Sequence, residues 1–340
     1  MTRYDKILGN LIGGAMGDSM GAPTEERSTA MILRDFGGYV TEFLDSPLDT
    51  WAHGAAAGMV TDDFSLAYFT AQAIAENGGH ATTEAAQKAL LKWCEYPEYF
   101  DYNVGPTTRA AIEAMKGKKV EKKPGAITPA ADNGKATNGA AMKIGPMGLF
   151  SGGDIDRAID DAITVCLPTH RSDISLSGAC AVAAAVAKGL DPAAGIYEMV
   201  EAGMYGARRG MELGGKVGDQ AAGPSVEKRI WLAASIGMKA GGDWEKGMCE
   251  VRDIIGNGLM TVEAVPAAFG LFVSAGGDVM KTVYGGANIG GDTDTIACIA
   301  GCIAGTYAGT AGVPERYLDL IEEKNKFDLR GLARQIEELL

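Results

Sequence analysis

The chain has 340 residues and a formal net charge of −13, with 46% hydrophobic residues and a mean hydropathy of +0.01. This apolar content suffices for a sizeable core, whereas the acidic balance disfavours nonspecific binding to nucleic acid. No run of roughly 18 apolar residues predicts a transmembrane helix, and residues 1–6 lack the pattern of a secretory signal. We therefore expect a cytoplasmic protein without nucleic-acid or membrane partners.

Small and apolar residues recur at spacings of three and four along most of the chain, which is typical of closely packed helices. In chain order, the pattern predicts a glycine-rich helix that ends near Pro23, and then one short strand at 38–43. Further helices are predicted at 61–76, 83–94, 107–116, 155–166, 175–190, 192–205, 226–238, 244–255, 262–274, 294–309 and 314–323. The segment 117–135 reads as a long, functional loop. The expected fold class is all-α.

Two short motifs combine threonine and aspartate at predicted helix starts. They are segment 61–63, Thr-Asp-Asp, and segment 290–295, Gly-Gly-Asp-Thr-Asp-Thr. Helix capping explains one Thr or Asp at each place, but not the whole second motif. Four carboxylates with hydroxyls from two segments would suit two hard divalent cations, Mg²⁺ or Mn²⁺. Without cations the carboxylates would repel one another, so their convergence would require bound metal.

A third motif, GGAMGDSMGAPTE, spans residues 13–25. It describes a glycine-rich helix that ends at a proline turn followed by acids. Asp18 stands among Gly, Ala and Met residues, where an unpaired carboxylate is costly to bury. The sequence leaves two roles open for Asp18: it either holds the turn or takes part in the site.

The segments GGAMGDSMGAPTE, TDD and GANIGGDTDTIACIAGCIAG resemble the ADP-ribosylglycohydrolase family, which includes dinitrogenase reductase-activating glycohydrolase and the ADP-ribosyl-acceptor hydrolases. The resemblance spans about residues 7–312. It implies a compact orthogonal helical bundle, with residues 1–340 forming a single domain. It also implies a binuclear Mg²⁺ or Mn²⁺ centre.

The resemblance assigns roles to individual residues. Glu25 matches the family glutamate near the scissile bond and is the candidate catalytic residue. The implied metal ligands are Thr61, Asp62, Asp63, Asp292, Asp294 and Thr295. The NGAAM segment from Asn138 resembles a family motif that binds the phosphate-bearing ligand, and His170 matches a histidine of the cleft. The candidate substrate contacts are Asn138, Gly139, His170, Asn288, Gly290 and Gly291.

Three positions depart from the family pattern. Phe64 stands where many members have a second Thr, and we expect its ring to change the space beside the metal ligands. Asn103 replaces an acid and cannot act as a base or nucleophile. Lys143 replaces an Arg, which keeps the positive charge but loses bidentate recognition of phosphate.

These features predict a metal-dependent hydrolase that cleaves a ribosyl glycosidic bond of an ADP-ribosylated substrate, with modified protein as one candidate. Water would attack the anomeric carbon through an oxocarbenium-like state. One alternative is a hydrolase of small nucleosides or other ribosides, and another is a noncatalytic protein that binds an ADP-ribose-type ligand. A phosphatase of the haloacid-dehalogenase type would need a strand before Asp292, and the Gly and Asn residues of segment 283–289 disfavour one.

Overall fold

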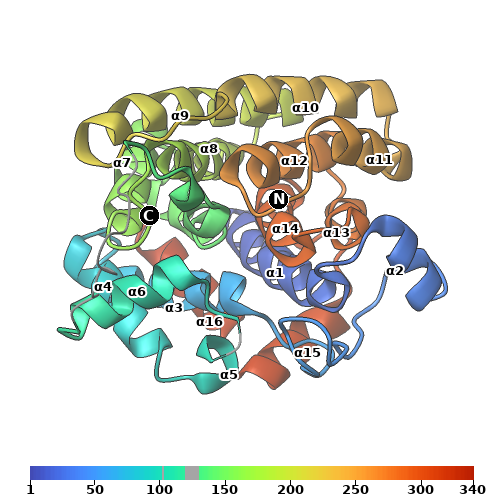
Figure 1. Ribbon diagram of the computed structural model, residues 1–340, viewed down its shortest axis with the longest axis horizontal. Helices are drawn as coiled ribbons and strands as arrows, with labels where there is room; N and C mark the ends of the chain where they lie inside the picture. Colours follow the sequence, from blue (N-terminus) through green and yellow to red (C-terminus); the bar gives the residue numbers. More distant parts are fainter. Residues whose placement is uncertain (102, 119–129) are drawn as a thin grey trace.

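The structure, a computed structural model, describes residues 1–101, 103–118 and 130–340. Its α-helices confirm the all-α class, and β contacts among these residues are limited to two isolated bridges. Figure 1 shows the arrangement of α1 (Arg3–Gly21), α2 (Thr29–Asp35), α3 (Asp62–Glu76), α4 (Thr83–Trp93), α5 (Pro97–Phe100), α6 (Pro106–Met115), α7 (Ile155–Cys166), α8 (Asp173–Gly189), α9 (Ile196–Val217), α10 (Val226–Ala240), α11 (Trp244–Ile254), α12 (Thr261–Ser274), α13 (Val279–Asn288), α14 (Thr293–Ala308), α15 (Glu315–Asn325) and α16 (Leu329–Glu338). Four short 3₁₀ segments accompany them: η1 (Ala22–Thr24), η2 (Asn133–Lys135), η3 (Asn138–Ala140) and η4 (Gly145–Ser151).

Helices α1 and α14 form the centre of the molecule and meet along a seam of glycines. A Cβ atom on Gly13 would overlap the carbonyl oxygen of Gly301, and a Cβ atom on Gly301 would overlap that of Gly13. At the end of the seam, a Cβ atom on Gly21 would overlap the backbone of Asp294. The missing side chains therefore let two backbones touch, which brings the end of α1 against the aspartates that begin α14.

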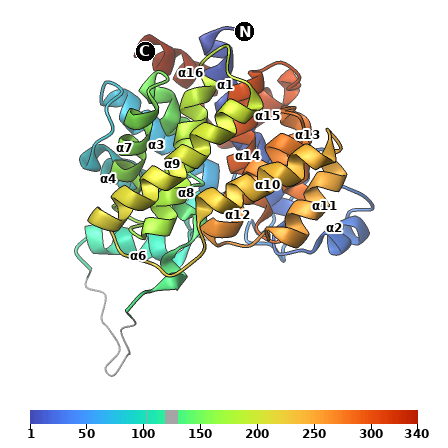
Figure 2. The same cartoon turned by 90° about the horizontal axis from the view of Figure 1, so that it is seen from above.

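Two layers of helices cover this centre on one side. Helices α8 and α12 are buried on nearly every face, α9 packs on α8, and α10 packs on α12 (Figure 1). Figure 2 shows α9 and α10 as the outermost layer, with both chain termini at one edge of the molecule. No helix in the described ranges combines the length and hydropathy that a bilayer-spanning segment requires.

Every predicted helix overlaps an observed one, but the short strand predicted at 38–43 is wrong. The backbone N–H of Val40 donates to Asn288 Oδ1 at 2.8 Å, and Asn288 Nδ2 donates to the Val40 carbonyl at 2.8 Å. A side-chain amide thus satisfies the groups that a neighbouring strand would have paired. The predicted loop 117–135 lies mostly outside the described residues.

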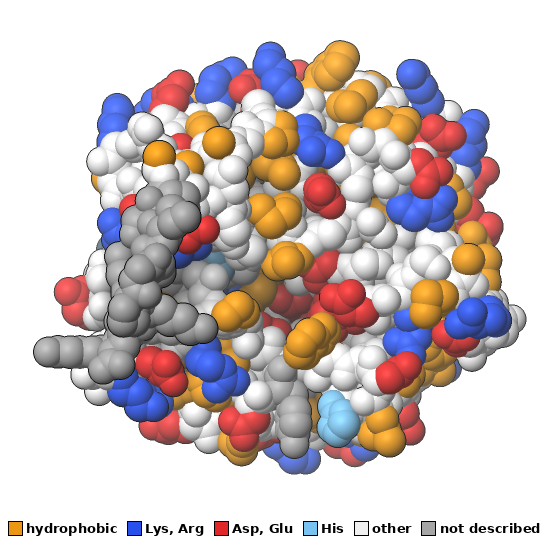
Figure 3. Space-filling view, viewed as in Figure 1, with side chains coloured by type: hydrophobic (Ala, Val, Ile, Leu, Met, Phe, Trp, Pro, Cys, Tyr) orange, Lys and Arg blue, Asp and Glu red, His pale blue; other side chains and the backbone are white. Residues whose placement is uncertain are grey.

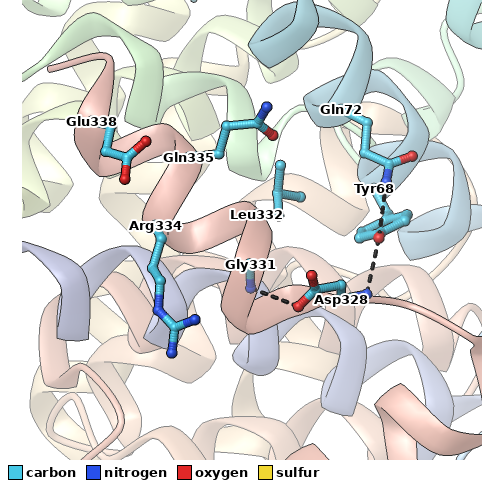
Figure 4. A pocket seen from close by; sticks show the side chains of 8 residues that line it. All are labelled: Tyr68, Gln72, Asp328, Gly331, Leu332, Arg334, Gln335 and Glu338. Atoms are coloured by element: carbon cyan, nitrogen blue, oxygen red, sulfur yellow. Dashed lines mark hydrogen bonds between the residues drawn. The ribbon is translucent and has the colours of Figure 1, made fainter.

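The C-terminal helix α16, which was not predicted, packs against α1 and α3. A small surface cavity lies between α3 and α16 and is drawn in Figure 4. At its edge the Tyr68 hydroxyl accepts hydrogen bonds of 3.0 Å from the Asp328 backbone and from the Gln72 amide. Asp328 also accepts the Gly331 N–H at 2.7 Å and so caps α16. The bond between Tyr68 and Asp328 joins α3 to the start of α16.

Candidate active site

One cavity has a volume of about 520 Å³ and receives side chains from segments far apart in the sequence. Six acids line it: Glu25, Glu26, Asp62, Asp63, Asp292 and Asp294. They come from the turn after α1, the start of α3 and the start of α14. Figure 3 shows a hollow near the middle of one face, where acidic side chains gather between hydrophobic ones. No Lys or Arg occurs among the described residues of the lining.

Asp18 sets the position of the Thr-Asp-Asp motif at residues 61–63. Its carboxylate accepts the backbone N–H of Thr61 at 2.7 Å and that of Phe64 at 2.8 Å, so it binds the first turn of α3. Burial raises the pKa of Asp18 to about 7, although these hydrogen bonds act to lower it. Asp18 does not line the cavity. It therefore holds the helix start that presents Asp62 and Asp63, a role that the sequence had left open.

The segment that carries Glu25 is paired with the glycines before α14. The Glu26 N–H donates to the Gly291 carbonyl at 2.9 Å, and the Gly291 N–H donates to the Arg27 carbonyl at 2.9 Å. Gly290 and Gly291 have φ angles of 85° and 69°, a region that favours glycine. This pairing brings Glu25 beside Asp292 and Asp294.

One carboxylate oxygen from each of Glu25, Asp292 and Asp294 lies within 4.8 Å of the others. The threonines of the motifs join this group: the Thr61 hydroxyl donates to Asp294 Oδ2 at 3.4 Å, and Thr295 lines the cavity. All six residues predicted as metal ligands are therefore gathered in one place, together with Glu25.

The electrostatics of the group fit bound cations. Burial raises the pKa of Asp62, Asp63 and Asp294 well above the usual range, and neighbouring carboxylates raise it further. Burial, followed by the charge of Asp292, raises the pKa of Glu25 to about 9. Asp63 Oδ2 and Glu25 Oε2 are buried and have no hydrogen-bond partner among the described residues. Hard oxygen donors that are buried, acidic and unpaired are suitable ligands for Mg²⁺ or Mn²⁺.

The predicted substrate contacts divide into two groups. Asn138, Gly139, His170 and Gly291 line the cavity, whereas Asn288 and Gly290 do not. Asn288 is fully buried and binds Val40, so the structure corrects its predicted place in the cleft. A Cβ atom on Gly290 would come within 2.8 Å of the Arg27 carbonyl oxygen, so this glycine allows the close approach of the two paired backbone segments.

Of the three departures from the family pattern, Asn103 lines the cavity, whereas Phe64 and Lys143 do not. The Phe64 ring is fully buried, lies 6.4 Å from the Phe327 ring and does not line the cavity, so the expected effect on the metal site is wrong. Lys143 is buried outside the lining, and its charge does not face the cleft. Asn103 does line the cavity, and its Oδ1 atom is buried without a partner.

Two hydrophobic residues of the lining were missed by the sequence reasoning. Trp51 and Leu259 keep 59% and 56% of their surface exposed at the cavity. An exposed Trp is a signal for binding, but its exposure cannot be read from the sequence.

The sequence model of the ADP-ribosylglycohydrolase family matches residues 1–340. The uncharacterized protein YegU of Escherichia coli (strain K12) is 32% identical over 305 residues, which cover 88% of this chain and 86% of that protein. The ADP-ribosylhydrolase ARH3 of Bos taurus is 26% identical over 351 residues, covering 95% of this chain and 90% of that protein.

A solved structure, that of an ADP-ribosylglycohydrolase-related protein complex, superposes with a TM-score of 0.68 at 21% identity. The match covers 99% of this chain and 98% of that chain, and it shows a shared fold. The match of the family model over residues 1–340 shows family membership in addition to the fold. The chain therefore belongs to the ADP-ribosylglycohydrolase family and is a hydrolase of glycosidic bonds.

Proposed function

We propose that the protein is a metal-dependent hydrolase that cleaves the ribosyl bond of an ADP-ribosylated substrate, with residues 1–340 acting as one domain. The observation that carries the proposal is the group of Glu25, Asp292 and Asp294, whose carboxylate oxygens lie within 4.8 Å of one another. Ionised carboxylates at this separation repel one another, which raises their pKa, and bound cations would remove that repulsion. A site for two Mg²⁺ or Mn²⁺ ions would account for the convergence of these carboxylates.

The ions would be held by Thr61, Asp62, Asp63, Asp292, Asp294 and Thr295. When bound, two divalent cations supply a clamp for the ribose hydroxyls and lower the pKa of water. The surrounding carboxylates favour the positive charge that develops on the ribose during cleavage. Glu25, whose carboxylate lies within 4.8 Å of those of Asp292 and Asp294, would position the attacking water or the leaving group.

A second candidate function is the hydrolysis of small nucleosides or other ribosides. It is supported by the composition of the cavity, which has six acids and no Lys or Arg among its described lining residues. In such a cavity, only neutral hydrogen-bond donors and bound cations would be present to balance the negative charge of a diphosphate. A smaller, uncharged riboside has no such requirement.

A panel of substrates tests both candidates. ADP-ribosyl-arginine, ADP-ribosyl-serine and several nucleosides would be incubated with the protein and Mg²⁺, Mn²⁺ or EDTA. We expect metal-dependent release of ADP-ribose from at least one ADP-ribosyl substrate. Turnover of nucleosides alone would replace the proposal with the second candidate, and full activity in EDTA would remove the metal from it. Binding of ADP-ribose without any turnover would make the protein a ligand-binding member of the family.

A further inference from the structure

Lys143 is a buried lysine outside the acidic group. Its side chain is 1% exposed, and among the described residues it forms no ion pair. The one hydrogen bond that its side chain makes to a described residue runs from Nζ to the Thr169 hydroxyl at 2.7 Å. Burial lowers the pKa of Lys143, which reflects the cost of a charge in this place. The cost of burying this amine suggests that Lys143 has a specific role, which depends on its partner Thr169.

Thr169 connects Lys143 to a residue of the cavity. The Thr169 oxygen accepts from Lys143, and the same oxygen lies 3.0 Å from Nδ1 of His170. The hydroxyl proton could also go to the Cys166 carbonyl at 3.4 Å. However, that carbonyl already accepts the backbone N–H of Thr169 at 3.0 Å and that of His170 at 2.8 Å. With both lone pairs of the carbonyl in use, Nδ1 is the better acceptor for the hydroxyl.

A hydroxyl that donates to Nδ1 leaves the ring proton of a neutral histidine on Nε2. His170 lines the cavity, and Nε2 has no hydrogen-bond partner among the described residues. A Cβ atom on Gly139 would come within 2.5 Å of Nε2, so the absence of a side chain at Gly139 provides the space that this nitrogen occupies.

We propose that Lys143 and Thr169 are positioning residues that hold His170 in the neutral Nε2–H tautomer, so that Nε2 donates to an acceptor oxygen of the substrate. The nature of that oxygen rests on the proposed function; the tautomer does not. Burial, with a smaller effect from the nearby Lys143, lowers the pKa of His170 to about 3, so the ring stays neutral near pH 7. His170 is therefore a fixed, uncharged donor in a cavity whose described lining has no Lys or Arg.

The tautomer can be measured directly by ¹⁵N nuclear magnetic resonance of the Mg²⁺-loaded protein with labelled histidine. The chain has 3 histidines, His53, His80 and His170, and a His170→Gln variant assigns the signal. We expect the Nε2–H pattern in the unchanged protein. In Lys143→Met, a side chain of similar length without donors, the Thr169 oxygen becomes free to accept from Nδ1–H. The Nδ1–H form should then appear, with KM raised about tenfold and kcat less affected.

Thr169→Ser and Thr169→Val form a matched pair. The serine variant keeps the hydroxyl and should retain the Nε2–H pattern and an unchanged KM. The valine variant should lose the Nε2–H pattern and have a raised KM. If Thr169→Val does not fold, Lys143→Met still decides, because it replaces a buried amine with an apolar side chain of similar length. An Nδ1–H pattern in the unchanged protein overturns the proposal, as does a Lys143→Met variant with unchanged tautomer and KM. Absence of turnover with an Nε2–H pattern would count against the proposed function alone.

Discussion

Asn138 and Asp292 stand 154 positions apart in the chain, and the Asn138 amide donates a 2.6 Å hydrogen bond to Asp292 Oδ2. Asn138 is itself fixed, because its backbone N–H donates to the Leu259 carbonyl at 3.0 Å. The bond occupies one oxygen of a proposed metal ligand and orients the other. A loop that contributes no ligand therefore determines how one ligand faces the cavity.

Replacing Asn138 with Ala should weaken the metal site without removing a ligand. Partners that orient a metal ligand typically contribute about 10–100-fold in metal affinity or activity, and we expect a loss in that range for Asn138→Ala. Raising the Mg²⁺ concentration should restore part of the activity, because the six proposed ligands remain. Steady-state rates across a metal titration measure both effects. A loss that no metal concentration reverses would show that Asn138 acts on the substrate instead.

Asp62 and Asp292 should be essential for activity but not for folding. Asn at either position keeps the shape and removes one charge from a group of buried acids, so we expect at least about a 100-fold loss of activity with a folded protein. Mg²⁺ at 100 times its Kd should stabilise the unchanged protein by about 2.7 kcal/mol, and this gain should shrink in both variants. Glu250→Gln, on the exposed side of α11, is the control. Full activity in Asp62→Asn or Asp292→Asn would refute the metal site.

The sequence predicted the helices well because apolar and small residues recur with helical spacing along them. It also located the acidic motifs, since capping alone does not require so many oxygens at two helix starts. Contacts between distant residues could not be predicted in this way. The pairing of Val40 with Asn288 replaces a predicted strand, and it joins residues 248 positions apart.

The direction in which a side chain points was the other limit. Phe64 and Lys143 lie beside motif residues, and both were expected to affect the cleft. Phe64 turns into the core because it lies in the first turn of α3, a helix that is buried on nearly every face. Lys143 turns toward Thr169 and does not line the cavity. Rotation about a helix or turn decides such cases, and sequence spacing does not specify it at the end of an element.

The glycine seam between α1 and α14 should be sensitive to a single methyl group. In Gly301→Ala the new Cβ atom would overlap the Gly13 carbonyl oxygen, so the helices must separate. We expect a loss of about 1–3 kcal/mol or more in the free energy of unfolding, measured in urea. Gly215→Ala in α9 is the matched control, because no atom lies within 4 Å of its Cβ position. That variant should gain about 0.5–1 kcal/mol from helix propensity. Equal effects in the two variants would contradict close packing at the seam.

His170 should make the stability of the protein fall as the solution is acidified. Burial lowers its pKa to about 3 in the folded state, below the ordinary value of 6.5. Between these values the unfolded chain binds a proton that the folded protein does not, so stability is present above pH 6.5 and is lost as the pH falls. The loss should be about 1.4 kcal/mol per pH unit. The cavity carboxylates, whose pKa is raised, act in the opposite direction, so only a comparison with a variant isolates the histidine.

The comparison is between the unchanged protein and His170→Gln, each unfolded in urea at several pH values from about 7.5 to about 5. The carboxylates contribute equally to both proteins, so the difference between their free energies of unfolding reports His170. That difference should decline below pH 6.5 by about 1.4 kcal/mol per unit, with His170→Gln becoming relatively more stable. The exposed His80 provides the control, since His80→Gln should track the unchanged protein. A difference that does not vary with pH would mean that His170 binds its proton over the same pH range in the folded and unfolded states, and a ring held neutral by burial would then be ruled out.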